Sequence, residues 1–180
     1  MEGKGRRNGG AESQLERKRY PAVRRYPTRN DLPSAVQAAD VLNALLADSL
    51  DLVHQAKQAH WNAKGMQFFS LHSLFDQVAK EAWKASDLLA ERVVQLGGVA
   101  EGGIRVAANR SRLLEYPHSM AEGREHVEAV ASALAAFGTN VRNAIEEAGE
   151  LDDPATVDIL TEISRGADKQ LWLVEAHLHG

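Results

Sequence analysis

Beyond its first 33 residues, the chain consists almost entirely of four long segments in which apolar residues recur every three or four positions. This spacing predicts amphipathic helices, because 3.6 residues per turn places such residues on one face. No segment alternates apolar and polar residues as a half-buried strand would. The sequence therefore predicts an all-α protein whose helices cover residues 34–62, 68–96, 119–148 and 154–177.

The connections between these helices are short, long and short, and this order constrains the topology. Residues 97–118 form the long middle connection, within which we expect a short helix at residues 111–116. Such a connection can run the length of a bundle and make the second and third long helices parallel. The predicted fold is thus a ferritin-like four-helix bundle with a short helix in the crossover. An up-and-down bundle with a decorated loop is the alternative.

Two of the predicted helix ends carry local signals. Gly97-Gly98 should end the second helix, because glycine readily takes the left-handed conformation found there. Asp152-Asp153-Pro154 should begin the last helix, with proline at the first helical position after an acidic cap.

The first 33 residues differ from the rest in composition and charge. They are rich in glycine and arginine, contain three prolines and have few aliphatic residues, so we expect a disordered tail before a helical domain at 34–180. Nine basic and four acidic residues give the tail a charge of +5, which leaves −9 for the remainder of a chain of net charge −4. A basic arm on an acidic body suggests binding to nucleic acid or another anionic partner, and a solvated tail that only aids solubility is the alternative. The expected DNA contacts are Arg17, Lys18, Arg19, Arg24 and Arg25.

Several absences narrow the class of protein. The chain has no cysteine, which excludes disulfides, thiolate metal sites and thiol nucleophiles. No apolar run approaches the roughly 20 residues of a membrane helix, and no apolar segment follows the basic N-terminus as in a secretory signal. These features predict a cytoplasmic protein without a membrane partner, associated with the nucleoid if it binds DNA.

The second predicted helix carries polar residues that a helical core would normally avoid. On a helical wheel, Asp76, Asp87 and Glu91 lie about 40°, 60° and 100° from His72, so all four residues share one stripe. His60 lies just upstream, on the apolar stripe of the first helix. One reading is a set of metal ligands, and the other is an ordinary polar stripe at a subunit interface, with salt bridges such as Asp87–Arg92.

The axial spacing decides how such ligands could meet. Asp76 and Asp87 are eleven residues apart, about 16 Å along a helix, which is too far for one ion within one chain. A second copy of the helix packed antiparallel across a two-fold axis would bring each His/Asp pair to the other chain's Asp/Glu pair. Two imidazoles with carboxylates and no sulfur suit iron, and also zinc or manganese.

The same residues resemble the signature of the Dps family of mini-ferritins. The matching positions are His60-Trp61-Asn62, Gly65, Phe68, Leu71-His72, Asp76, Asp87-Leu88-Leu89-Ala90-Glu91-Arg92 and Leu96-Gly97-Gly98. The final segment, TEISRGADKQLWLVEAHL, is also similar to the last helix of that family. The resemblance covers about residues 29–178 and its combined motif is highly specific.

The resemblance implies a hollow dodecamer that binds iron(II) at its dimer interfaces, oxidises it preferentially with hydrogen peroxide and stores the ferric mineral. By position, His60, His72 and Asp76 would come from one subunit, and Asp87 and Glu91 from its two-fold mate. It also implies an acidic three-fold pore near the start of the last helix. The candidate pore residues are Glu150, Asp152, Asp153 and Asp158.

Some positions limit what the resemblance transfers. Many members of the family have an acidic residue directly after the second histidine, where this chain has Ser73, which puts mineral nucleation in doubt. Trp61 adjoins a predicted ligand and could intercept stray oxidising equivalents, although packing is the simpler role; Trp83 is expected to pack. The competing function is a nucleoid-compacting DNA-binding protein with a degenerate or structural metal site.

Overall fold

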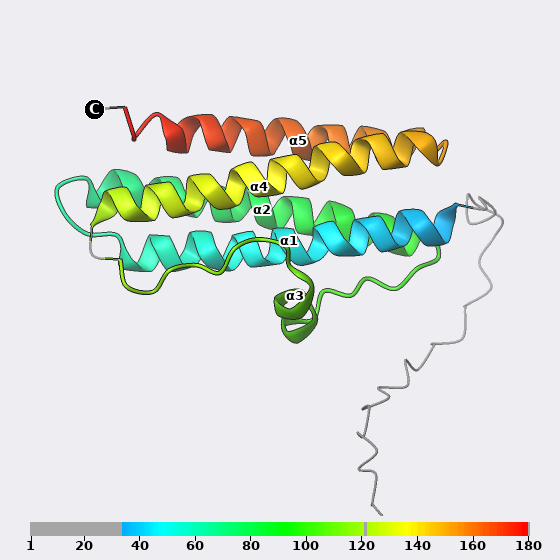
Figure 1. Ribbon diagram of the computed structural model, residues 1–180, viewed down its shortest axis with the longest axis horizontal. Coiled ribbons are helices and arrows are strands. Elements are labelled where there is room, and N and C mark those ends of the chain that lie inside the picture. Colours follow the sequence, from blue (N-terminus) through cyan, green and yellow to red (C-terminus); the bar gives the residue numbers. More distant parts are fainter. Residues whose placement is uncertain (1–33, 121, 180) are drawn as a thin grey trace, which may run out of the picture.

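The computed structural model describes residues 34–120 and 122–179, and these residues form five helices (Figure 1). Their order is α1 (Ala35–Asn62), α2 (Phe68–Gln95), α3 (Ile104–Arg110), α4 (Gly123–Glu150) and α5 (Pro154–Glu175). No strand occurs among the described residues, and the predicted all-α class is confirmed. The basic tail and its five candidate DNA contacts lie outside the described residues.

Four of the helices form one bundle with the expected crossover. Figure 1 shows α1 and α2 running antiparallel, after which the chain returns past α3 so that α4 starts at the same end as α2. Helices α2 and α4 are therefore parallel, and α5 returns alongside α4. The helix pairs in contact include α1 with α2, α4 with α5, α1 with α4 and α2 with α5. This is the ferritin-like arrangement, and the up-and-down alternative is excluded.

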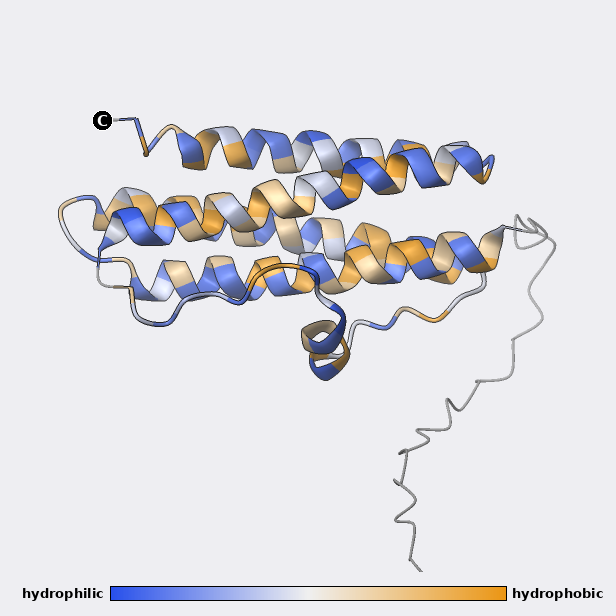
Figure 2. Ribbon diagram, viewed as in Figure 1, coloured by the Kyte–Doolittle hydropathy of each residue, from blue (hydrophilic) through white to orange (hydrophobic). Residues whose placement is uncertain are grey.

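Apolar faces of the four long helices meet along the bundle axis. Figure 2 shows hydrophobic and hydrophilic residues alternating around each long helix. Large side chains such as Leu42, Phe75, Leu89 and Phe137 are almost completely buried there, and each contributes about 1.5–3 kcal/mol through burial. None of the described helices is apolar over a stretch long enough to cross a membrane.

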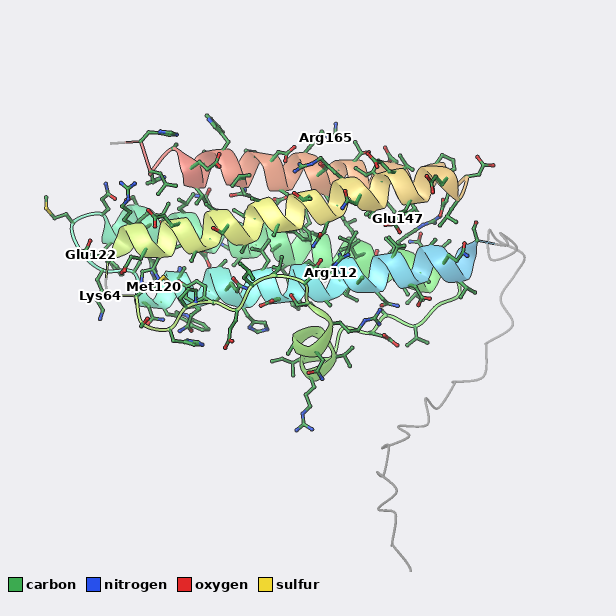
Figure 3. The ribbon with its side chains drawn as sticks, viewed as in Figure 1. Lys64, Arg112, Met120, Glu122, Glu147 and Arg165 are labelled. Carbon is green, nitrogen blue, oxygen red and sulfur yellow. The ribbon has the colours of Figure 1, made fainter. Side chains whose placement is uncertain are left out.

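The short crossover helix lies before the predicted position. Residues 111–116 are not helical, and α3 occupies Ile104–Arg110 instead. The cause is the buried carboxylate of Asp48, which accepts hydrogen bonds from the backbone N–H of Arg112 (2.7 Å) and from its guanidinium (2.6 and 3.0 Å). Gln55 donates to the Leu114 carbonyl. These bonds to α1 hold the segment in a non-helical conformation, and Figure 3 shows Arg112 where the crossover passes α1.

The two predicted helix ends are confirmed. Gly97 has φ of 83°, and the Gly98 N–H donates to the Val93 carbonyl, which closes α2 in the manner of a glycine C-cap. At the start of α5, Asp153 is the N-cap, its carboxylate accepts from the Thr156 N–H, and Pro154 is the first helical residue.

Candidate metal centre

The two predicted histidine ligands lie face to face where the end of α1 meets the start of α2. The rings of His60 and His72 stack with centroids 3.6 Å apart and planes at 21°. Each ring bonds to the other residue's backbone: His60 Nδ1 lies 2.7 Å from the His72 carbonyl oxygen, and His72 Nδ1 lies 2.9 Å from the His60 carbonyl oxygen. The ring of Phe68 packs beside His72, with its centroid 5.1 Å away.

This reciprocal bonding fixes which nitrogen can bind a metal. A carbonyl oxygen only accepts hydrogen bonds, so Nδ1 of each ring carries the hydrogen. In the neutral imidazole, Nε2 then keeps its lone pair. Metal-binding histidines are commonly oriented in this way, with the second nitrogen donating to a backbone carbonyl. Both His60 and His72 therefore present Nε2 as the donor atom.

Asp76 lies one turn beyond His72 on α2 and is held by two lysines. Its Oδ1 accepts from Lys57 Nζ at 2.9 Å, and its Oδ2 pairs with Lys80 Nζ at 2.8 Å. The hydrogen bond from Lys80, followed by that from Lys57, lowers the pKa of Asp76 to about 2. The carboxylate is thus ionised at any physiological pH.

Lys57 is a functional neighbour that the sequence reasoning missed. It precedes His60 by three residues on α1, and its ammonium group also lies 6.0 Å from the centroid of the Trp61 ring. Its Nζ occupies the side of Asp76 that faces α1, so a metal ion using that oxygen has to displace it. The sequence did contain a sign of it in the spacing Lys57-x-x-His60, because residues three apart share a helix face.

Asp87 and Glu91 stand one turn apart near the other end of α2, and both are exposed. Neither side chain has a hydrogen bond or an ion pair with another described residue. Trp83, one turn before Asp87, is also 62% exposed in the single chain, although we expected it to pack. This end of α2 therefore presents two carboxylates and an indole without a partner from the described part of the chain.

Within one chain these residues form two half-sites and not a complete site. Because α2 is one continuous helix from Phe68 to Gln95, the separation of about 16 Å between Asp76 and Asp87 holds. Among residues 34–120 and 122–179, no three His, Asp or Glu side chains come together in a way that could hold an ion. The His60–His72–Asp76 half and the Asp87–Glu91 half lie at separate levels of the bundle.

The residue after Glu91 fastens this end of α2 to the rest of the bundle. Arg92 is buried and donates to both carboxylate oxygens of Asp153 at 2.9 Å and to Thr156 Oγ1 at 2.9 Å. The salt bridge suggested between Asp87 and Arg92 is therefore wrong. Burial of Asp153 favours the protonated acid, but bonds from Thr156 and Arg92 outweigh it and lower the pKa of this carboxyl.

Three of the candidate pore residues, Glu150, Asp152 and Asp153, lie at the turn between α4 and α5, and Asp158 lies one turn into α5. Glu150, Asp152 and Asp158 are exposed, and Asp152 has φ of 54° in the tight turn. Asp153 is 1% exposed, and its carboxylate is occupied by Arg92 and the α5 cap. The remaining candidates differ in exposure: the Trp61 side chain is 65% exposed in the single chain, and Ser73 is partly exposed.

A family model and a relative of known name both match most of this chain. The model of the ferritin-like domain family matches residues 39–180. The DNA protection during starvation protein of Agrobacterium fabrum is 39% identical over 158 residues, which cover 87% of this chain and 98% of that protein.

Two solved structures of similar proteins agree with the fold. DpsC from Streptomyces coelicolor superposes with a TM-score of 0.82 at 31% identity, covering 88% of this chain and 93% of that one. Dps from Microbacterium arborescens, solved in a high iron form, gives a TM-score of 0.77 at 32% identity, covering 82% and 97%.

Proposed function

This chain belongs to the Dps family of ferritin-like proteins, and we propose that it oxidises iron(II), stores the ferric product and so protects DNA. The observation that carries the proposal is the His60–His72 pair, whose Nδ1 atoms are bonded to backbone carbonyls so that both Nε2 atoms are left as donors, one turn of α2 from the ionised Asp76. Support also comes from relatives named for DNA protection during starvation and from the high iron form of one similar structure.

The proposed iron site is shared by two subunits. The His72/Asp76 pair and the Asp87/Glu91 pair lie symmetrically about a point between Glu81 and Ala82. Antiparallel packing of α2 on its two-fold mate at this point brings each half-site to the other, giving two sites per dimer. Trp83, beside this midpoint and exposed in the single chain, would be covered in such a dimer.

The donor set suits iron chemistry. Imidazole nitrogen binds iron(II), and the carboxylates of Asp76, Asp87 and Glu91 stabilise iron(III) through their negative charge. Two iron(II) ions supply the two electrons that hydrogen peroxide needs. Two iron(II), one peroxide and two protons then give two iron(III) and two water molecules, with no hydroxyl radical. An incoming dication would displace the Lys57 ammonium from Asp76 and take its place as the positively charged partner of that carboxylate.

Storage requires an enclosed space and an entrance. We assign the assembly to a hollow dodecamer of two-fold dimers, as the family resemblance implies. The exposed carboxylates of Glu150 and Asp152 at the α4–α5 turn, with Asp158 in the first turns of α5, are the proposed cation entrance. Negative charge along a narrow passage raises the local iron(II) concentration. The buried ion pair between Asp153 and Arg92 fixes this turn to α2.

The reaction is tested by mixing purified protein with iron(II) under anaerobic conditions and then adding half an equivalent of peroxide per iron. Ferric absorbance should rise during mixing, and a spin trap should report little hydroxyl radical compared with free iron. Prior addition of zinc(II) or manganese(II) should slow the reaction, since both ions suit the same ligands. Oxidation no faster than that of free iron(II) would contradict the proposal.

Non-specific DNA binding is the second proposed function, and the charge distribution favours it. A +5 tail on a −9 body, repeated on one shell, offers many cations to phosphates. The full chain should shift DNA of unrelated sequences in a gel, and the shift should weaken steeply as salt rises. A chain lacking residues 1–30 should lose it, whereas binding that survives the deletion would place the DNA contacts elsewhere. If the full chain binds DNA but oxidises iron slowly, DNA compaction is its main function.

A further inference from the structure

Tyr116 and His126 form a buried pair between the crossover and α4. Tyr116 Oη lies 2.5 Å from His126 Nδ1, and the two rings are stacked at 18°. The residues are 6% and 2% exposed. The remaining ring nitrogen of His126, Nε2, is also buried and makes no hydrogen bond to any described residue.

The environment sets the protonation state of the pair. Burial raises the pKa of the Tyr116 phenol, so the phenol keeps its proton. Burial is the largest effect on His126 and lowers its pKa. Glu125 and the Asn62 backbone raise this pKa, and Lys64 lowers it slightly. The net effect is a lowered pKa, so the imidazole is neutral. The phenol therefore donates to Nδ1, and the histidine hydrogen lies on Nε2. A protonated phenol thus lies within hydrogen-bond distance of an unprotonated imidazole nitrogen, His126 Nδ1.

The pair lies beside the His60–His72 half-site. The backbone of Asn62 is close enough to His126 to raise the pKa of its imidazole. Asn62 is the last residue of α1 and follows His60 by only two residues, about 3 Å of helix rise. At the start of α4, a side-chain carbon added to Gly123 would come within 2.7 Å of Leu71, the neighbour of His72. The N-terminal turn of α4 is thus packed against the same ends of α1 and α2 that carry the two histidines.

We propose that Tyr116 is a reserve electron donor for the iron site, and that His126 takes its proton. This inference rests on the proposed iron oxidation. It concerns a site that holds a single iron(II) when peroxide arrives, where one electron is missing for complete reduction to water. The short, buried hydrogen bond gives the phenol a route to oxidation in which its proton moves to Nδ1.

The step balances in atoms and electrons. One iron(II) becomes iron(III) and gives one electron; the phenol gives the second electron and passes its proton to His126. With two protons from solvent, one peroxide becomes two water molecules, and the products on the protein are a neutral phenoxyl radical and an imidazolium. Without a base, the oxidised phenol would have to remain a radical cation, which is a far stronger acid than an imidazolium. A base at hydrogen-bond distance takes its proton as the electron leaves, and the positive charge then lies on the ring of His126.

The test uses the full-length protein loaded anaerobically with one iron(II) per site, mixed with one equivalent of peroxide and frozen for EPR spectroscopy. A tyrosyl radical should form, and its spectrum should narrow when tyrosine is ring-deuterated. Tyr116→Phe should abolish the signal and increase hydroxyl-radical spin adducts several-fold. The chain has three tyrosines, so Tyr20→Phe/Tyr26→Phe is the matched control and should keep the signal.

His126→Gln tests the proton acceptor, because glutamine accepts a hydrogen bond but does not take a proton. Its radical yield should fall at neutral pH while circular dichroism shows an intact helical fold. A signal that persists in Tyr116→Phe, or that is insensitive to tyrosine deuteration, overturns the inference; an unchanged yield in His126→Gln overturns the role of His126. Iron oxidation at two iron(II) per site should be unaffected by Tyr116→Phe, and its absence in the wild type would instead refute the proposed iron oxidation.

Discussion

Replacing His72 by alanine should slow peroxide-driven oxidation of iron(II) by about 100-fold or more, because even outer partners of metal ligands contribute 10–100-fold. The substitution removes one donor nitrogen and also the ring that stacks on His60, although His60 Nδ1 can still donate to the backbone carbonyl of residue 72. The rate is measured from ferric absorbance after mixing with peroxide. His54→Ala is the matched control, since His54 is an exposed histidine on α1 outside the proposed site and should leave the rate unchanged.

The same assay can test whether each site is built from two subunits. A chain with His72→Ala/Asp76→Asn and a chain with Asp87→Asn/Glu91→Gln should each be inactive alone. Co-expressed, they should recover roughly a quarter of the wild-type rate, because random pairing makes half the dimers mixed and each mixed dimer has one intact site. No recovery, in mixed assemblies of normal size, would contradict a site built from two subunits.

Replacing Arg92 by leucine should lower the free energy of unfolding by about 3–5 kcal/mol, the usual cost of removing one partner from a buried ion pair. The variant leaves the Asp153 carboxylate buried at the α4–α5 turn without its guanidinium. The measurement is the thermal unfolding midpoint at fixed protein concentration, because assembly makes the midpoint concentration-dependent. Arg142→Leu is the control: its pair with Asp168 also joins two helices but is exposed, so the expected loss is below about 1 kcal/mol.

Two additional results are expected because the Asp153 carboxylate is buried and ionised. Arg92→Leu/Asp153→Asn should recover part of the lost stability, because asparagine still caps α5 and no charge is left buried. The pKa of Asp153 is lowered by folding from its ordinary value of 3.8. The contribution of the pair is therefore complete above about pH 4 and is lost as the pH falls through the folded-state pKa. The difference between wild type and Arg92→Leu should shrink in acid, and a midpoint equal to that of Arg142→Leu at pH 7 would refute the structural role.

Local pattern was enough to predict the long helices and two of their ends. The apolar spacing sets which face of each helix is buried, while Gly97 and the Asp153-Pro154 pair act within one turn of their own position. The same holds for the alignment of His72 with Asp76, which follows from helix geometry alone. The axial distance between the two halves of the site likewise required only the rise per residue.

Contacts between distant residues decided what the pattern could not. The short helix was placed wrongly because Asp48, 64 positions away, captures the backbone of Arg112. Arg92 bonds to Asp153, 61 positions away, and not to Asp87 on its own helix. The stacking of His60 on His72, the bond from Lys57 to Asp76 and the Tyr116–His126 bond likewise depend on which segments meet. Periodicity and caps are encoded within a few residues, whereas buried polar side chains take their partners from whichever elements packing brings beside them.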